Sequence, residues 1–195
     1  MGIRKMAVFA SGGGSGLQAI IDACESGRLS AGVNLVISNN SKSKALQRAK
    51  NHNIPAKHFS AVVIPDAEQL NQEMLNTLRL HDVEIIFLAG YLKKLGSNIL
   101  RAYERKIFNI HPSLLPKYGG QGMYGINVHQ AVINAGETET GITIHHVTEE
   151  YDTGKIIAQK KISVEPNDTA ETLAARVLKE EHVFIVETLE NILKI

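Results

Sequence analysis

Apolar positions fall into two recurring patterns along the chain. Short runs rich in β-branched residues predict strands at 5–10, 33–38, 56–59, 84–89 and 106–110. In the longer stretches between them, apolar residues recur at helical spacing, which predicts helices at 15–26, 42–52, 66–81 and 97–103. The alternation of strand and helix favours βαβ units around a mostly parallel sheet.

The helix expected at 42–52 carries its own boundary signals. A serine at its start can accept hydrogen bonds from free N–H groups, apolar residues recur at 45, 46 and 49, and Pro55 ends the segment. Local sequence therefore predicts both ends of this helix.

The pattern changes in the last third of the chain. The stretch 126–137 has helical spacing, and two longer strands follow at 141–148 and 154–164. The turn between them, EEYDT, predicts an antiparallel hairpin. An Asp-x-x-Glu signal at Asp168 opens a final helix. We expect a single α/β domain over 1–195, Rossmann-like, with a mostly parallel central sheet, helices on both faces and an antiparallel C-terminal edge.

A glycine-rich loop, SGGGSG at 11–16, joins the first strand to the first helix. Such a loop turns backbone N–H groups and the positive end of the helix dipole toward an anion, typically a phosphate. Gly14, Gly16 and Ala19 fit the dinucleotide pattern, but the second strand ends in ISNN, without the acid that would hold a ribose. The Lys-Ser/Thr of a Walker loop is also missing. Phosphate binding is favoured, and a loop that only permits close packing stays open.

The stretch NIHPSLLP at 109–116 places an Asn and a His at the end of a predicted strand. Pro112 favours an extended backbone at His111, so Asn109 and His111 share one face. A proton donor beside an amide donor is the pairing that stabilises a carbonyl oxygen as it becomes tetrahedral. Ser113 lacks the G-x-S-x-G context of a nucleophile. The stretch therefore favours attack by an amine of the substrate.

Asp152, in the turn EEYDTGK, is the best candidate to orient His111 or to relay its proton. A purely structural interpretation stays open for both residues. A lone His before Pro can serve packing alone, and Asp followed by Thr-Gly is common in turns.

Composition narrows the class of protein. A chain of 195 residues with 44% hydrophobic content suits one domain with a substantial core. The 21 basic and 20 acidic residues leave a net charge of only +1, which argues against a general nucleic-acid binder. No apolar run is long enough for a signal peptide or a membrane span. We expect a soluble, cytoplasmic protein whose partners include neither nucleic acid nor membrane.

No metal centre is expected. The single cysteine, Cys24, excludes an intrachain disulfide and a Cys-based zinc site, and should be a small buried apolar residue. His145 and His146 are adjacent on a strand and point to opposite faces, so they cannot bind one metal ion as a pair. No H-E-x-x-H spacing occurs on a helix.

The string at 109–116, the Asp152-x-Gly154 motif and the loop at 11–17 together resemble the formyltransferase family that uses 10-formyltetrahydrofolate. The resemblance covers nearly the whole chain. Within the family, the glycine loop and the short length are similar to the members that formylate glycinamide ribonucleotide in purine biosynthesis. The resemblance implies that Asn109 and protonated His111 stabilise the oxyanion while Asp152 orients His111 and assists proton transfer through water.

The resemblance also assigns substrate contacts. It implies a phosphate-binding half at about 1–100 and a folate and catalytic half at about 101–195. The ribonucleotide contacts would be Gly14, Ser15, Gly16 and, for the ribose, Glu181. The folate contacts would be Leu92, Lys93, Lys94, Leu95, Asn109, Thr148, Glu149, Glu150, Tyr151 and Asp152. Gly16 stands where relatives commonly have Asn, and Lys93 where an Arg is often found.

The largest departure from the family follows the specific string. Residues 117–129 read KYGGQGMYGINVH, longer and richer in glycine than in many relatives, with His129 expected near the helix start. This loop either reshapes the mouth of the site or replaces one surface turn with another, and the sequence leaves both open.

Three other functions remain as alternatives. The methionyl-tRNA formyltransferase and the formyltetrahydrofolate deformylase resemble the same core but carry an additional domain, whereas here the core is expected to begin at residue 5 and to run to the end of the chain. The near-neutral charge also disfavours tRNA. A nucleotide-binding regulatory module would have little use for Asn109, His111 and Asp152 together. We expect a monomer or a weak homodimer.

Overall fold

Seven strands and six helices follow one another along residues 2–194, the part of the chain that this computed structural model describes. The first nine elements begin and end within two residues of the predicted bounds. In chain order the elements are β1 (Arg4–Phe9), α1 (Ser15–Glu25), β2 (Ala31–Ser38), α2 (Lys44–Asn51), β3 (Ala56–His58), α3 (Ala67–Leu80), β4 (Ile85–Leu88), α4 (Ser97–Ala102), β5 (Ile107–His111), α5 (Ile126–Asn134), β6 (Glu139–His146), β7 (Ile156–Ser163) and α6 (Ala170–Ile192).

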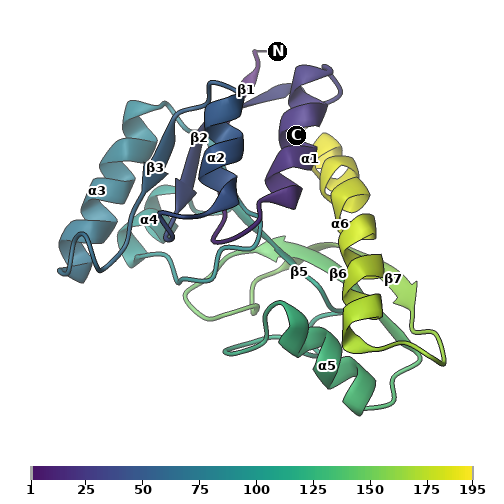
Figure 1. The fold of residues 1–195 in the computed structure, drawn as a ribbon. Coiled ribbons are helices and arrows are strands. Elements are labelled where there is room, and N and C mark those ends of the chain that lie inside the picture. Colours follow the sequence, from purple (N-terminus) through teal and green to yellow (C-terminus); the bar gives the residue numbers. More distant parts are fainter. Residues whose placement is uncertain (1, 195) are drawn as a thin grey trace.

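The strands form one sheet in the order β3-β2-β1-β4-β5-β6-β7 (Figure 1). The pairs among β1 to β5 are parallel, whereas β6 runs antiparallel to β5, and β7 antiparallel to β6. The mostly parallel sheet and its antiparallel C-terminal edge are therefore confirmed. Strand order reverses between β1 and β4, and in open α/β sheets ligands bind beside the carboxyl ends of strands at such a point.

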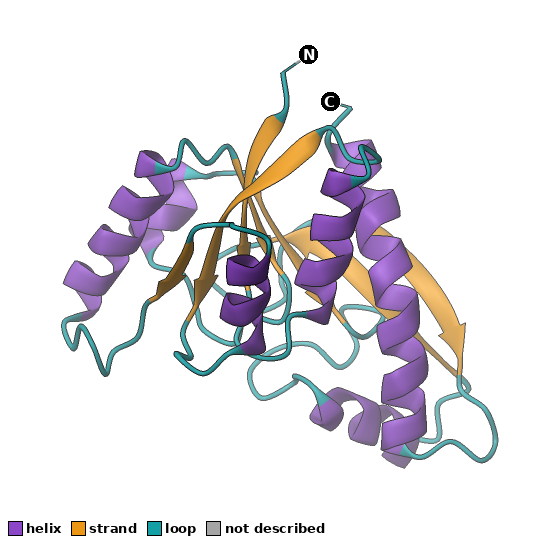
Figure 2. Ribbon diagram, turned by 45° about the horizontal axis from the view of Figure 1, so that its top comes forward, coloured by secondary structure: helices purple, strands orange, loops and turns teal. Residues whose placement is uncertain are grey.

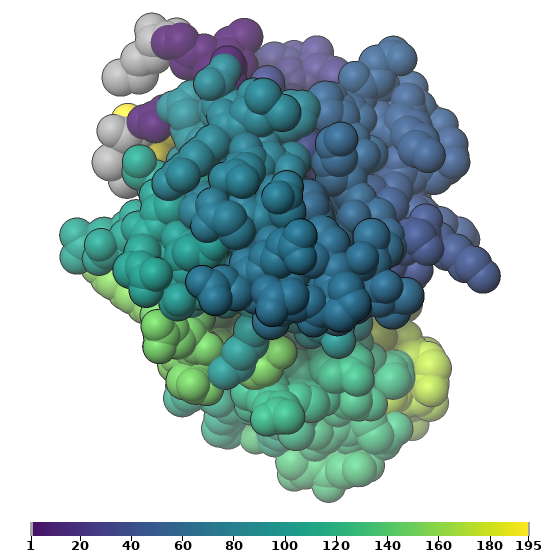
Figure 3. All heavy atoms as spheres, turned by 90° about the vertical axis from the view of Figure 1, so that its left-hand side faces the viewer, coloured from purple at the N-terminus to yellow at the C-terminus, as the bar shows by residue number. Residues whose placement is uncertain are grey.

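Helices cover both faces of the sheet, as expected (Figure 2). Met6 and Val8 of β1 belong to the core that α1, α2, α5 and α6 cover, while Ala7 and Phe9 belong to the core that α3 and α4 cover. Alternate residues of a strand point to opposite faces, so continuous apolar runs supply both cores. In the space-filling view, the green atoms of the C-terminal half lie below the blue and teal atoms of the N-terminal half (Figure 3).

Two helix caps test the local signals. A serine caps α2, as expected, but it is Ser43, which accepts a hydrogen bond from the N–H of Ala45, so the helix starts two residues later than predicted. The signal at Asp168 is wrong by one residue, because Thr169 is the N-cap of α6. Both carboxylate oxygens of Asp168 instead accept from Arg176, at 2.6 and 2.7 Å. This pairing lowers the pKa of Asp168 to about 2.

Two smaller expectations concern Cys24 and membrane spans. Cys24 packs partly buried against the core, and burial raises the pKa of its thiol to about 11. A thiol with so high a pKa stays protonated at neutral pH and is a poor nucleophile.

Within 2–194, no helix is both long enough and apolar enough to cross a bilayer.

Candidate active site

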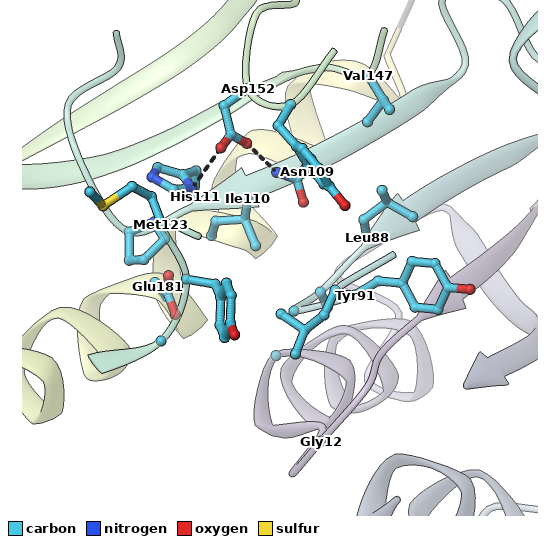
Figure 4. A pocket seen from close by; sticks show the side chains of 18 of the residues that line it. Gly12, Leu88, Tyr91, Asn109, Ile110, His111, Met123, Val147, Asp152 and Glu181 are labelled. Atoms are coloured by element: carbon cyan, nitrogen blue, oxygen red, sulfur yellow. Dashed lines mark hydrogen bonds and ion pairs between the residues drawn. The ribbon is translucent and has the colours of Figure 1, made fainter. Parts of the chain in front are cut away.

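One cavity of about 860 Å³ opens at the carboxyl ends of β1, β4 and β5, where the strand order reverses (Figure 4). The residues with predicted roles all line this cavity: Gly14, Ser15, Gly16, Leu92, Lys93, Lys94, Leu95, Asn109, His111, Thr148, Glu149, Glu150, Tyr151, Asp152 and Glu181. The fold thus brings the predicted residues together around one space. Their individual roles remain predictions.

The loop between β1 and α1 presents free N–H groups at one end of the cavity. Gly14 has φ 67, and a Cβ there would come within 2.8 Å of Ala45, so this position requires glycine. In the described part of the chain, the backbone N–H groups of residues 12–16 donate to no backbone carbonyl. The first turn of α1 holds no acid. Open donors at the start of a helix suit a phosphate, and close packing against α2 holds the loop in place.

Asn109 and His111 point from one face of β5 toward Asp152, in the turn after β6 (Figure 4). His111 Nδ1 lies 3.5 Å from Asp152 Oδ2, and Asn109 Nδ2 lies 3.4 Å from Asp152 Oδ1. Asp152 has φ 57, in the left-handed region that Asp tolerates better than most residues. The three side chains predicted to act together therefore form one cluster.

Burial dominates the electrostatics of this cluster. Burial lowers the pKa of His111, and the charge of Asp152 only partly opposes this effect. Burial alone would raise the pKa of Asp152, but hydrogen bonding to His145, the charge of His111 and the N–H of Gly120 outweigh it, so the pKa is lowered. The free site therefore holds a carboxylate beside an imidazole that is mostly neutral at pH 7.

The loop from 118 to 126 shapes the site directly. The carbonyl oxygen of Tyr118 accepts from His111 Nε2 at 2.7 Å, and Gly120 N–H donates to Asp152 Oδ2 at 2.9 Å. Residues 120–126 line the cavity. The loop is therefore part of the cavity wall and contacts the catalytic cluster. Because a carbonyl can only accept, a neutral His111 carries its proton on Nε2.

Two further histidines face the cavity without a predicted role. His145 is buried, pairs with Asn109 across β5 and β6, and places Nε2 3.1 Å from Asn109 Nδ2 and 3.4 Å from Asp152 Oδ1. His129 of α5 is also buried, and its Nδ1 has no hydrogen-bond partner among the described residues.

Strand alternation could have identified His145, but only with the register known. His146 points to the other face and packs against Phe108, so the predicted opposition of the two neighbours is confirmed. Which of them faces Asn109 depends on the β5–β6 pairing, which the sequence did not show.

Among residues 2–194, no group of three or more His, Cys, Asp or Glu is arranged to hold a metal ion.

The remaining predicted residues come from the loop after β4, the turn after β6 and α6, and all of them line the cavity. Lys94, after β4, lies 3.0 Å from Glu150 in the turn after β6, and its Nζ lies 5.1 Å from the ring centroid of Tyr151. These contacts join the two segments for which folate binding is predicted. On α6, Glu181 lines the cavity, and burial raises its pKa to about 7. Its carboxyl group can therefore donate or accept a hydrogen bond near neutral pH.

Known proteins share both the sequence and the fold around this cavity. Residues 4–189 match the family described as formyl transferase. The chain is 46% identical over 192 residues to the chloroplastic phosphoribosylglycinamide formyltransferase of Vigna unguiculata. The aligned region covers 96% of this chain and 60% of that protein. It is 38% identical over 191 residues to the phosphoribosylglycinamide formyltransferase of Bacillus subtilis (strain 168). Here the aligned region covers 98% of this chain and 95% of that protein. The chain thus spans less than two thirds of the plant relative.

A solved structure extends the likeness to three dimensions. The crystal structure of phosphoribosylglycinamide formyltransferase from Bacillus halodurans superposes with a TM-score of 0.91 at 37% identity, covering 97% of this chain and 95% of that one. The match therefore includes the parallel sheet, the antiparallel edge and the segments that form the cavity. With the family match over 4–189, the fold and the cavity lead to one conclusion: the chain belongs to the formyl transferase family.

Proposed function

We propose that this protein transfers the formyl group of 10-formyltetrahydrofolate to the amine of glycinamide ribonucleotide, giving formylglycinamide ribonucleotide and tetrahydrofolate in purine biosynthesis. One observation carries the proposal: the open N–H groups of the glycine loop and the cluster of Asn109, His111 and Asp152 line the same cavity. A ribonucleotide whose phosphate occupies the loop can extend its amine toward the cluster. The similarity to a named relative of nearly equal length supports this assignment.

The ribonucleotide is proposed to bind along the side of the cavity formed by α1 and α6. Its phosphate accepts from the backbone N–H groups of Gly14, Ser15 and Gly16. Its ribose hydroxyls bind Glu181, whose pKa of about 7 leaves the carboxyl group able to donate or accept. This arrangement fixes the position of the amine by contacts that do not take part in the chemistry.

The chemistry is an attack by the amine on the formyl carbon. A bond forms between the amine nitrogen and that carbon, and the bond from the carbon to the folate nitrogen breaks. Asn109 and protonated His111 donate to the formyl oxygen while it carries negative charge. The proton lost by the amine replaces the formyl group on tetrahydrofolate, relayed through water by Asp152. Asp152 also holds the ring of His111 through Nδ1.

One contact couples this step to the loop at 118–126. His111 Nε2 donates to the carbonyl of Tyr118 at 2.7 Å, so that N–H is occupied in the free protein. Nδ1 faces Asp152. Donation from Nε2 to a formyl oxygen therefore requires Tyr118 to release it, and the position of the loop becomes part of the catalytic step.

The folate is proposed to lie between the two segments that Lys94 and Glu150 join. Leu92 to Leu95 and Thr148 to Asp152 form its walls, and Lys93 supplies a cation for the glutamate tail. The N-terminal half of one domain thus binds the phosphate, and the C-terminal half supplies most of the folate and catalytic contacts. The protein is proposed to act in the cytoplasm as a monomer or a weak homodimer.

A single assay tests the reaction. The protein is incubated with 10-formyltetrahydrofolate, with and without glycinamide ribonucleotide, and release of tetrahydrofolate is followed. The proposal expects release only when both substrates are present. Release without the ribonucleotide would identify a deformylase, and no release under either condition would favour a nucleotide-binding module.

A further inference from the structure

Helix α2 lies directly behind the glycine loop, beside α1 (Figure 1). The carbonyl of Gly12 accepts from Ser43 Oγ at 2.9 Å and from the N–H of Ala45 at 3.2 Å. The carbonyl of Gly13 accepts from Arg48 Nε at 2.9 Å. In a trans peptide the N–H points away from the carbonyl of the same unit. With both carbonyls held by α2, the N–H groups of Gly13 and Gly14 face away from it.

The guanidinium of Arg48 contacts only neutral acceptors in the part of the chain that the structure describes. Its second contact is Gln18 Oε1, at 3.0 Å, so both of its acceptors are neutral. Among the described residues, Arg48 forms no ion pair with any Asp or Glu, and the first turns of α1 and α2 contain no acid. Hence a fixed positive charge lies behind a loop whose N–H groups are open.

The charge of Arg48 is also felt at α6. Burial is the main cause of the lowered pKa of His182, next to Glu181, and the charge of Arg48 adds to it. Through its hydrogen bond to Gly13, the same charge lies beside the loop proposed to bind phosphate. A cation at that position favours an anion in the loop, and the effect falls with ionic strength.

We propose that Arg48 is a positioning residue for the phosphate of the ribonucleotide. It fixes the orientation of the Gly13–Gly14 peptide and adds positive charge behind it, without touching the phosphate. The inference rests on the proposed function, since it takes the glycine loop as the phosphate site. A merely structural role, as a tether between α2 and the loop, would change stability and leave substrate affinity as it is.

Two substitutions separate these roles. Arg48→Met removes the charge and the hydrogen bond to Gly13, and Arg48→Lys keeps the charge but loses the fork that bridges Gly13 and Gln18. Lys50→Met is the matched control, because Lys50 is exposed on the same helix. Circular dichroism and thermal melting identify the temperature at which all variants are folded.

The expected result is a selective loss of ribonucleotide affinity. Arg48→Met should raise the KM for glycinamide ribonucleotide about 10- to 100-fold, because one charge-assisted contact that organises the loop is lost. Its kcat and folate KM should stay within about twofold of the wild type, as should all constants of Lys50→Met. Arg48→Lys should be intermediate, and its ribonucleotide KM should depend on salt more steeply than that of Arg48→Met.

The result can be distinguished from failure of the proposed function. If the wild type turns over the ribonucleotide and Arg48→Met leaves its KM unchanged, or lowers kcat instead, the positioning role is overturned. If the wild type shows no turnover, the proposed function fails, and the role of Arg48 is then measured by calorimetry with inorganic phosphate. Weaker phosphate binding by Arg48→Met would support the inference, and equal binding would overturn it.

Discussion

The two ends of the cavity are built from different parts of the chain. At the end proposed to bind phosphate, called the phosphate end, the groups that face the cavity are peptide N–H donors of one continuous loop, and a side chain at Gly14 would collide with Ala45. At the catalytic end, the working groups are side chains from β5 and from the turn after β6, which meet across the β5–β6 pairing. The first end depends on local backbone conformation, and the second on tertiary distances and ionisation.

This difference predicts separable effects on catalysis. A disturbed loop weakens contacts that the substrate and the transition state share, so KM rises and kcat stays. A disturbed cluster loses contacts that form with the developing charge, so kcat falls. Variants of the glycine loop should therefore change KM, and variants of the catalytic cluster should change kcat.

The largest effect is expected for His111→Ala. Loss of the proton donor should lower kcat about 10²- to 10⁴-fold, with little change in either KM. The control is His81→Ala, at the end of α3 and outside the cavity. Steady-state kinetics with both substrates measure the change. A kcat close to that of the wild type would remove His111 from the mechanism.

At the other end, Gly14→Val should act on binding. Its φ of 67 and the 2.8 Å approach to Ala45 force the loop to shift, which should raise the KM for the ribonucleotide about 10- to 100-fold through lost hydrogen bonds to a charged group. The folate KM should remain unchanged. Gly27→Ala is the control, since Gly27 has φ 75 but open space around it, and so shares the strain without the collision. Equal increases in both KM values would mean that the loop does not bind the phosphate.

The conformation of the glycine loop could be predicted from the sequence because its determinants are local. A glycine loop between a strand and a helix has one common geometry, and the capping serine of α2 follows from adjacent residues. At the catalytic end, the shared face of Asn109 and His111 also followed from strand alternation. The approach of Asp152 did not, since it needs the hairpin to fold back; its turn made Asp152 a candidate, and the family resemblance supported that candidate.

Other features of the catalytic end had no local signal. His145 reaches the cluster only because β6 pairs with β5 in one register, and a shift by one residue would bring His146 there instead. The contact between the Tyr118 carbonyl and His111 depends on how the loop at 118–126 folds back, which no local pattern indicates. The N-cap predicted at Asp168 was wrong, because Arg176, two turns later in α6, binds its carboxylate and Thr169 caps the helix instead.

A smaller effect is expected for His145→Gln, because His145 acts through Asn109 and Asp152. Loss of one hydrogen-bonding partner should lower kcat about three- to tenfold. Burial lowers the pKa of His111 most, and the charge of His145 adds to that effect. Removing this charge should raise the pKa of His111, so the protonated form persists to higher pH and the alkaline limb of kcat moves upward.

Two measurements check the sign of this shift. The pH profile of kcat gives the limb, and NMR titration of the His111 ring protons gives the pKa directly. His146→Gln is the matched control, because His146 points to the opposite face and is not among the groups that shift His111. A pKa of His111 that falls in His145→Gln would contradict the assigned geometry.

The smallest effect sharpens the comparison most, because it separates stability from binding at the phosphate end. Ser43 caps α2 and also donates to the carbonyl of Gly12, whereas Asp66 caps α3, away from the cavity. Ser43→Ala and Asp66→Ala should each lower the free energy of unfolding by about 1 kcal/mol, measured by urea denaturation. Only Ser43→Ala should also raise the ribonucleotide KM, by about threefold, because one neutral hydrogen bond to the loop is lost. If the two variants lose stability alike and neither changes KM, α2 supports the fold but does not organise the loop.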